Sequence, residues 1–159
     1  ASVKMRLISR EIEMKVDYDE ESLEVNIDVR WFERAVKNLL TNAIKHTPDG
    51  GAIEISVRRE GERLRATVSD TGCGIPAEDL RRIFDRFYTR ERGNKKAPKG
   101  TGLGLAIAKH IIELHEGSIS VTNRTGGGAE FSMTVPLALP LEGIALTEPV
   151  KSEEPLQVV

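Results

Sequence analysis

One long amphipathic helix constrains the fold of this chain more than any other feature. The helix is expected over residues 29–46, because Asp28 can cap its first turn and the proline and glycines of residues 47–51 end helices. Apolar side chains gather on one face, at Val36, Leu39, Leu40 and Ala43. This pattern predicts a helix that packs against a hydrophobic core.

The same helix carries an unusual polar face. Asn38, Asn42 and Lys45 stand at i, i+4 and i+7, so their side chains share one side of the helix. Asparagine is a poor residue for a helix interior, because its side chain competes for backbone hydrogen bonds. Two asparagines followed by a lysine supply oxygen ligands for a hard cation and a positive charge for phosphate. The alternative is an ordinary solvated helix face.

Alternating segments on both sides of this helix predict strands that pair as hairpins. Residues 11–18 and 23–28 are expected to pair around an acidic turn at residues 19–21. Further hairpins are expected from residues 52–59 with 63–69, and from residues 118–123 with 129–135. Shorter helices are expected over residues 76–84 and 105–115. The pattern indicates one α/β domain over residues 1–137, followed by a flexible tail at 138–159; four of the seven prolines fall from Pro136 onward.

Composition excludes several classes of protein. The formal net charge of −2 gives no electrostatic reason to expect nucleic acid or an anionic membrane as a partner. Cys73 is the only cysteine, so neither a disulfide framework nor a cysteine-based zinc site is expected. No apolar run approaches the ~20 residues that a membrane-spanning helix needs.

A glycine-bearing turn follows the strand expected at residues 63–69. In the run Asp70-Thr71-Gly72-Cys73-Gly74-Ile75, the glycines let the backbone approach a ligand, and the carboxylate can accept a hydrogen bond, for example from the amine of adenine. The alternative is a tight turn with a capping aspartate. The dinucleotide fingerprint G-x-G-x-x-A also matches from Gly72, but it lies on a hairpin strand and lacks the acidic residue that would contact the ribose. The phosphate-loop pattern is missing from the chain.

A basic segment without periodicity follows at residues 85–104. It carries six basic residues against only two acidic ones, Asp85 and Glu91. A loop of this length is either disordered or functional. Its last residues, Gly100 to Gly104, open a helix, where free N–H groups and the helix dipole favour an anion. We therefore expect a mobile lid that orders when a nucleotide binds, although a simple glycine hinge would have the same sequence.

Together, these motifs resemble the catalytic and ATP-binding domain of bacterial sensor histidine kinases. The matching elements are the Asn-x-x-x-Asn helix, D-x-G-x-G, F-x-x-F at Phe84 and Phe87, G-x-G-x-G and a late glycine turn, within about residues 11–137. This domain belongs to a wider ATPase group that includes gyrase, heat-shock chaperones and mismatch-repair ATPases. The resemblance implies an α+β fold of the Bergerat type. Such a fold is a two-layer α/β sandwich with a mixed, mostly antiparallel sheet covered on one face by helices.

The resemblance also implies roles for individual residues. Asn42 would bind Mg²⁺ through its side-chain oxygen, Asn38 would support that site, and Lys45 would reach the phosphates of ATP. Asp70 would accept a hydrogen bond from the adenine amine, with Gly72 leaving room for the base.

Other positions complete the implied site. Arg86 resembles the arginine that steadies the γ-phosphate or the partner domain, and is therefore counted with Asn38 and Lys45 as a catalytic candidate. The remaining nucleotide-binding candidates are His46, Gly74, Ile75, Gly100, Thr101, Gly102, Leu103 and Gly104. One departure is visible: Ala129 follows Gly128, where the family often has a hydroxyl residue, so a water-bridged contact to adenine is not expected and ATP affinity should be modest.

Asn38 distinguishes phosphoryl transfer from hydrolysis. Members of the wider group that split water place a glutamate four residues before the metal asparagine, as general base. Here that position is Asn38, which takes no proton at neutral pH, and Glu33 lies about half a turn away around the helix. None of the three histidines has the acceptor pattern of the family. The chain is therefore expected to donate phosphate from Mg-ATP to a histidine on a separate dimerisation domain.

The implied partners are that phosphoacceptor domain of the same protein and a response regulator. The domain itself is expected to be monomeric, the whole kinase homodimeric, and the location cytoplasmic with a parent protein that can be anchored in the inner membrane. Two alternatives remain at this point. One is a serine kinase of the anti-sigma type on the same fold, and the other is a nucleotide-sensing module without catalysis.

Overall fold

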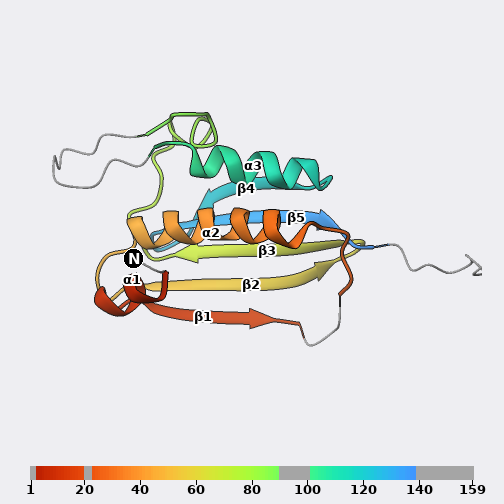
Figure 1. Cartoon of the computed structure of the whole chain (residues 1–159). Coiled ribbons are helices and arrows are strands. Elements are labelled where there is room, and N and C mark those ends of the chain that lie inside the picture. Colours follow the sequence, from red (N-terminus) through yellow and green to blue (C-terminus); the bar gives the residue numbers. More distant parts are fainter. Residues whose placement is uncertain (1–2, 20–22, 90–100, 139–159) are drawn as a thin grey trace, which may run out of the picture.

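The computed structural model of the chain describes residues 3–19, 23–89 and 101–138, which form three helices and one five-stranded sheet (Figure 1). The helices are α1 (Val3–Ser9), α2 (Val29–His46) and α3 (Gly104–Leu114). The strands are β1 (Glu13–Tyr18), β2 (Ala52–Glu60), β3 (Arg63–Asp70), β4 (Ser118–Asn123) and β5 (Ala129–Pro136). The region expected to be a tail, residues 138–159, lies outside the described residues except for Ala138.

Helix α2 has the predicted bounds and the predicted cap. The Asp28 carboxylate accepts hydrogen bonds from the backbone N–H groups of Arg30, at 2.9 Å, and Trp31, at 3.1 Å. These bonds satisfy two of the N–H groups that a helix start leaves without partners. The side chains that α2 buries completely are Ala35, Leu39, Ala43 and Ile44. The polar face with Asn38, Asn42 and Lys45 lies outside this buried strip.

The strand order is β1-β2-β3-β5-β4. The two hairpins expected in the middle and at the end of the domain are confirmed, since β2 pairs with β3 and β4 pairs with β5 in antiparallel fashion. The first expected hairpin is wrong, because β1 runs parallel to β2 and the connection between them contains α2. A long helical crossover is what allows two strands to run parallel.

Two further expectations from sequence differ from the structure. Residues 23–28 form no strand of their own, and only Val25 makes an isolated bridge, to Leu137 beyond the end of β5. Their alternation reflects an extended segment with one side half-buried, and not a ladder partner for β1. Residues 76–84 form a series of hydrogen-bonded turns in place of a helix, starting with bonds from the N–H groups of Asp79 and Leu80 to the Pro76 carbonyl.

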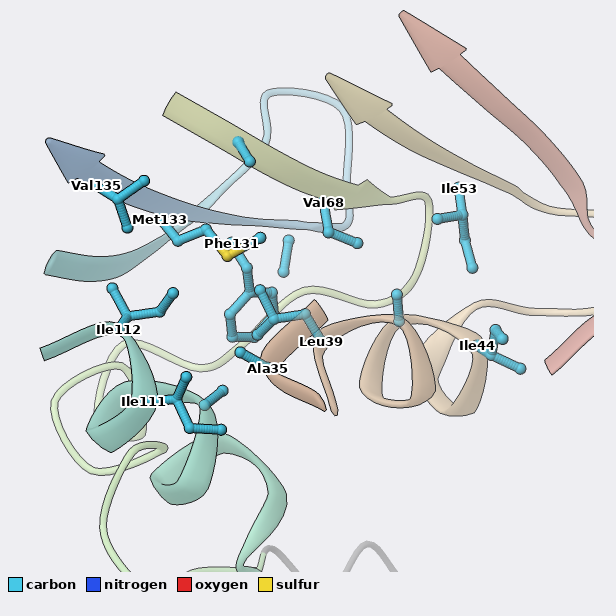
Figure 2. Close-up of a cluster of buried hydrophobic side chains, with 14 of the residues drawn as sticks. Ala35, Leu39, Ile44, Ile53, Val68, Ile111, Ile112, Phe131, Met133 and Val135 are labelled. Carbon is cyan, nitrogen blue, oxygen red and sulfur yellow. The ribbon is translucent and has the colours of Figure 1, made fainter. Parts of the chain in front are cut away.

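The core lies between the sheet and one layer of helices. Figure 2 shows Phe131, Met133 and Val135 from β5 pointing toward side chains of α2 and α3. The opposite face of the sheet carries charged and hydroxyl side chains, and Figure 1 shows no helix over it in the described residues. The architecture is therefore the expected α+β sandwich with a mixed, mostly antiparallel sheet covered on one face by helices.

Five chain segments meet at one end of the sheet (Figure 1). They are the end of α2, the start of β2, the end of β3, the β4–β5 turn and the start of α3. Within the described ranges, no helix combines the length and the apolar character that a bilayer crossing requires.

Candidate nucleotide site

Asp70 is the buried acid at this end of the sheet. It is the last residue of β3, and only 2% of its surface is exposed. Its Oδ1 accepts a hydrogen bond from the Gly72 N–H at 2.8 Å and a longer one from the Ala129 N–H at 3.4 Å. Both bonds use the same oxygen, so the second carboxylate oxygen is the one that could accept from a ligand amine.

The glycines of the Asp70 turn are required by its packing. A side chain at Gly72 would place its Cβ 2.5 Å from the His46 carbonyl oxygen and 2.7 Å from Asp70 Oδ1. Gly74 has a φ of +69°, and a Cβ there would lie 3.0 Å from the side-chain oxygen of Asn123. The turn is therefore pressed against both the end of α2 and the end of β4. This packing brings together His46 from α2 and Asp70, Gly72 and Gly74 from the D-x-G-x-G motif, which are two separate segments of the sequence.

Sequence reasoning missed one residue at this turn. Asn123, the last residue of β4, donates through Nδ2 to the Ile75 carbonyl at 2.6 Å and accepts at Oδ1 from the Ile75 N–H at 2.8 Å. Nothing in the spacing of the two residues, 48 positions apart, indicates this pair. The only available signal was an asparagine at a strand end beside a glycine-rich turn. We call residues 70–75 with the β4–β5 hairpin the base side of the site.

The polar face of α2 lies next to the start of α3. A Cβ at Gly104 would lie 3.6 Å from Asn38 Oδ1, which is ordinary van der Waals contact. The Asn38 Nδ2 atom is buried and has no hydrogen-bond partner among the described residues. Burying an amide N–H group without a partner costs free energy. A bound ligand that accepts a hydrogen bond from this atom would remove that cost. We call Asn38, Asn42, Lys45 and Gly102–Gly104 the phosphate side.

The start of α3 suits an anion. The N-cap position is occupied by Leu103, which offers no side-chain hydrogen bond, and the first turn contains no acidic residue. The N–H groups of such a start are available to an external acceptor, and the helix dipole favours negative charge there. Gly102 and Gly104 therefore lie where the sequence placed them, whereas Gly100 lies outside the described residues.

Asn42 is half-buried and Lys45 is exposed, one and two turns after Asn38 on α2. The described residues contain no group of three or more histidine, cysteine, aspartate or glutamate side chains arranged to hold a metal ion. Magnesium can be held by one or two protein oxygens together with phosphate oxygens and water. The donor set at this site fits such an ion, and the Asn42 side-chain oxygen would be its protein ligand.

Glu33, the acidic residue of α2, forms an ion pair away from the candidate site. Its carboxylate lies 2.6 Å from the Lys37 ammonium group on the exposed side of the helix. The hydrogen bond and the positive charge of Lys37 lower the pKa of Glu33 below its ordinary value. Glu33 is therefore no general base for this site, as the helical period predicts.

The two phenylalanines of the F-x-x-F motif have different environments. The Phe84 ring packs edge-on against the buried Phe131, with centroids 6.2 Å apart. Phe87 is 72% exposed and has a φ of +63°, which is rare for a bulky residue. Its N–H donates to the Gly102 carbonyl at 3.0 Å, and a Cβ at Gly102 would lie 2.6 Å from the Phe87 carbonyl carbon. The two described ends of the basic segment therefore meet, while residues 90–100, the centre of the predicted lid, lie outside the described residues.

Phe87 also borders an apolar groove of about 420 Å³ between α2 and α3. The groove begins at Leu103, next to the phosphate side, and Arg34, Arg86 and His110 add positive or titratable groups to its lining. The apolar lining consists of Trp31, Phe87, Leu103, Ala106, Ile107, Ile111 and Leu114. The structure thus places Arg86 in this groove.

The three histidines lie in three different places. His115 receives the Asp28 backbone N–H at Nε2, at 2.9 Å, and its Nδ1 lies 2.7 Å from the Ile111 carbonyl oxygen. The ring therefore joins the end of α3 to the cap of α2. His46 lies at the end of α2 and His110 borders the groove.

Comparison with known proteins shows which family has this fold and these motifs. Residues 27–139 match the family described as histidine kinase-, DNA gyrase B-, and HSP90-like ATPase. The chain belongs to this family. The matched residues include α2, the Asp70 turn, α3 and the β4–β5 hairpin, so the ATPase domain contains both sides of the site. ATP is therefore the nucleotide of this domain.

Curated relatives are sensor histidine kinases. The chain is 46% identical over 116 residues to the sensor histidine kinase TmoS of Ectopseudomonas mendocina, a match that covers 72% of this chain and 12% of TmoS. It is 37% identical over 133 residues to the sensor-like histidine kinase SenX3 of Mycobacterium tuberculosis, covering 84% of this chain and 32% of SenX3. The ATPase domain thus spans a minor part of the length of these relatives.

Solved structures show the same fold. The catalytic domain of the histidine kinase ThkA superposes with a TM-score of 0.73 at 32% identity, covering 84% of this chain and 85% of that one. ThkA in complex with the response regulator protein TrrA superposes with a TM-score of 0.70 at 29% identity, over 85% of this chain and 37% of that one. The predicted relationship to histidine kinase catalytic domains is confirmed.

Proposed function

We propose that this domain holds Mg-ATP at the Asp70 end of the sheet and donates the γ-phosphoryl group to a histidine on a separate dimerisation domain. The observation that carries the proposal is the position of Asn38. It lies beside the start of α3, its buried Nδ2 atom has no partner among the described residues, and a hydrolytic ATPase needs a carboxylate at this position. The site is thus equipped to orient phosphates without activating water.

Adenine is proposed to bind on the base side. The Asp70 carboxylate is buried and fixed by the Gly72 N–H, so its remaining oxygen can accept from the exocyclic amine. A hydrogen bond to a charged acceptor contributes about 1.5–3 kcal/mol. His46, at the end of α2, and Ile75, at the end of the turn, would flank the base.

The triphosphate is proposed to bind on the phosphate side. Asn42 would supply the protein oxygen for magnesium, Lys45 would neutralise phosphate charge, and the N–H groups at the start of α3 would meet phosphate oxygens. Bound magnesium neutralises charge on the transferring phosphoryl group. Thr101 and Leu103 would contribute through the backbone of the same turn.

The acceptor domain is proposed to dock in the apolar groove. The groove starts at Leu103, so a helix seated in it would lie next to the phosphate side. Phe87, which is exposed and has a left-handed backbone conformation, offers an apolar contact. Arg34 and Arg86 would pair with acidic side chains on that helix. We thus assign Arg86 to this interface, or to the γ-phosphate beside it.

A response regulator is the proposed recipient of the phosphoryl group after the histidine. Support comes from ThkA, which shares this fold and was solved with the response regulator protein TrrA. A homodimeric parent kinase follows from the same proposal.

The test is the transfer of labelled γ-phosphate to an added helical phosphoacceptor domain from a sensor histidine kinase. The ATPase domain alone should bind ATP, hydrolyse it slowly and remain unmodified, because a general base that typically contributes 10²–10⁴-fold is absent. Adding the acceptor domain should give acid-labile phosphohistidine on the acceptor. The Phe87→Ser variant should keep ATP affinity and lose most of the transfer.

Three results would contradict the proposal. Rapid phosphate release by the domain alone would indicate a hydrolase, and stoichiometric phosphohistidine at His46, His110 or His115 would place the acceptor within this chain. Acid-stable phosphate on a protein partner would indicate a serine kinase.

A further inference from the structure

The side chain of Asn123 pairs with the backbone of a single residue, Ile75. The amide group accepts from the Ile75 N–H at 2.8 Å and donates to the Ile75 carbonyl at 2.6 Å. Because one partner is a donor and the other an acceptor, these contacts fix which end of the amide is oxygen.

The backbone of the Asp70 turn is shaped around this amide. Gly74 has a left-handed φ of +69°, and a Cβ there would lie 3.0 Å from the Asn123 oxygen and 3.4 Å from the Gly128 carbonyl oxygen. A side chain at Gly74 would therefore displace the Asn123 amide from Ile75. The second glycine of the D-x-G-x-G motif serves this contact, in addition to any room that it leaves for a ligand.

The same hairpin also holds the other end of the turn. Gly128 approaches the Asp70 carbonyl so closely that a Cβ there would lie 1.8 Å from its oxygen, and the Ala129 N–H reaches Asp70 Oδ1 at 3.4 Å. Asn123 and Ala129 are directly opposite each other in the β4–β5 ladder. One pair of neighbouring residues thus fixes both the first and the last residue of the turn.

We propose that Asn123 is a positioning residue for nucleotide binding. It contacts the turn and not the nucleotide, and it fixes the orientation in which Asp70 meets the base. The inference rests on the proposed function, since it requires adenine at Asp70. Loosening the end of the turn at Ile75 should let the Asp70 carboxylate sample orientations that no longer match the adenine amine.

The test compares Asn123→Asp with the matched control Asn26→Asp. Asn26 is also exposed, lies outside both sides of the site, and undergoes the same change of charge. In Asn123→Asp the donor is lost and a carboxylate oxygen faces the Ile75 carbonyl oxygen. Since a hydrogen bond contributes about 0.5–1.5 kcal/mol, we expect ATP affinity to fall roughly three- to tenfold by calorimetry, with the control unchanged.

Base selectivity separates positioning from general destabilisation. Guanine presents a carbonyl oxygen where adenine presents an amine, so Asp70 should favour ATP over GTP. In Asn123→Asp the affinity for ATP should fall more than the affinity for GTP, and thermal unfolding should stay close to that of the control. An equal fall for both nucleotides, or wild-type affinity for ATP, would overturn the inference.

Amide hydrogen exchange without nucleotide tests the clamp itself. In Asn123→Ala, which removes both bonds, the Ile75 amide should exchange faster while the amides of β2 remain protected. Unchanged exchange at Ile75 would also overturn the inference. If the wild-type domain binds no ATP at all, the proposed function fails together with the inference, whereas wild-type ATP binding that is insensitive to Asn123 refutes the inference alone.

Discussion

On the base side, residues distant in sequence hold the Asp70 turn in place through hydrogen bonds from Asn123 and Ala129. On the phosphate side, the Asn38 Nδ2 atom is buried without a partner among the described residues, and α3 begins without a side-chain cap. The first arrangement is held in shape by protein hydrogen bonds alone, and the second presents donors that a ligand would satisfy. Under the proposed function, base recognition is therefore preformed, whereas phosphate binding supplies interactions that the described residues lack.

The largest effect is expected from Asn42→Ala on the phosphate side. Removing the proposed magnesium ligand should reduce phosphoryl transfer to an added acceptor domain at least about 100-fold, which corresponds to roughly 2.7 kcal/mol of activation free energy. Stability should not fall, because alanine is the better helix former. Magnesium should enhance ATP binding to the Asn26→Ala control but not to Asn42→Ala; normal transfer by Asn42→Ala would remove the metal assignment.

A pair of glycine substitutions tests how tightly the base side is built. Gly126 and Gly128 both have positive φ angles, +97° and +90°, but a Cβ at Gly126 meets nothing within 4 Å, whereas one at Gly128 would overlap the Asp70 carbonyl. Gly126→Ala should cost about 1–2 kcal/mol of unfolding free energy for its backbone angle. Gly128→Ala should cost about 1–3 kcal/mol more and also weaken ATP binding. Equal denaturation midpoints would show that the hairpin does not press on Asp70.

The smallest effect is expected from Gly104→Ala at the start of α3. The new Cβ would make ordinary contact with Asn38, and alanine gains up to about 1 kcal/mol over glycine within a helix. Unfolding by urea should therefore change by about 1 kcal/mol or less. Gly102→Ala is the contrasting variant, because its φ of +67° and its approach to Phe87 make it strongly destabilising. A large loss of stability in Gly104→Ala would mean that the start of α3 is as closely packed as the Asp70 turn.

The same two regions show how far the sequence alone could lead. The bounds of α2, its Asp28 cap and two hairpins followed from local patterns, and the order of the motifs indicated the family. Local patterns could not show that β1 pairs in parallel with β2, because that choice depends on where α2 carries the chain. They also could not show the Asn123–Ile75 pair, since a side-chain bond to the backbone leaves no periodic signal.

Some site residues could likewise be grouped from the sequence alone, and others could not. Asn38, Asn42 and Lys45 share a helix face, so their proximity followed from the helical period. That Gly72 packs on the His46 carbonyl, and Gly104 on Asn38, required the tertiary arrangement of α2, β3 and α3. The sequence indicated that Phe84 and Phe87 belong to one motif, but not that one is packed on Phe131 and the other is exposed.

The most direct test of the preformed base side is a calorimetric comparison of adenosine and Mg-ATP binding to the wild type, Asp70→Asn and Asn42→Ala. The Asp70→Asn change should cost about 1.5–3 kcal/mol for adenosine and for Mg-ATP alike, because only the base meets the carboxylate. Asn42→Ala should leave adenosine affinity unchanged and weaken Mg-ATP alone. If Asp70→Asn, in a domain with wild-type circular dichroism, left the affinity for adenosine intact, base recognition would not reside at Asp70 and the account would be contradicted.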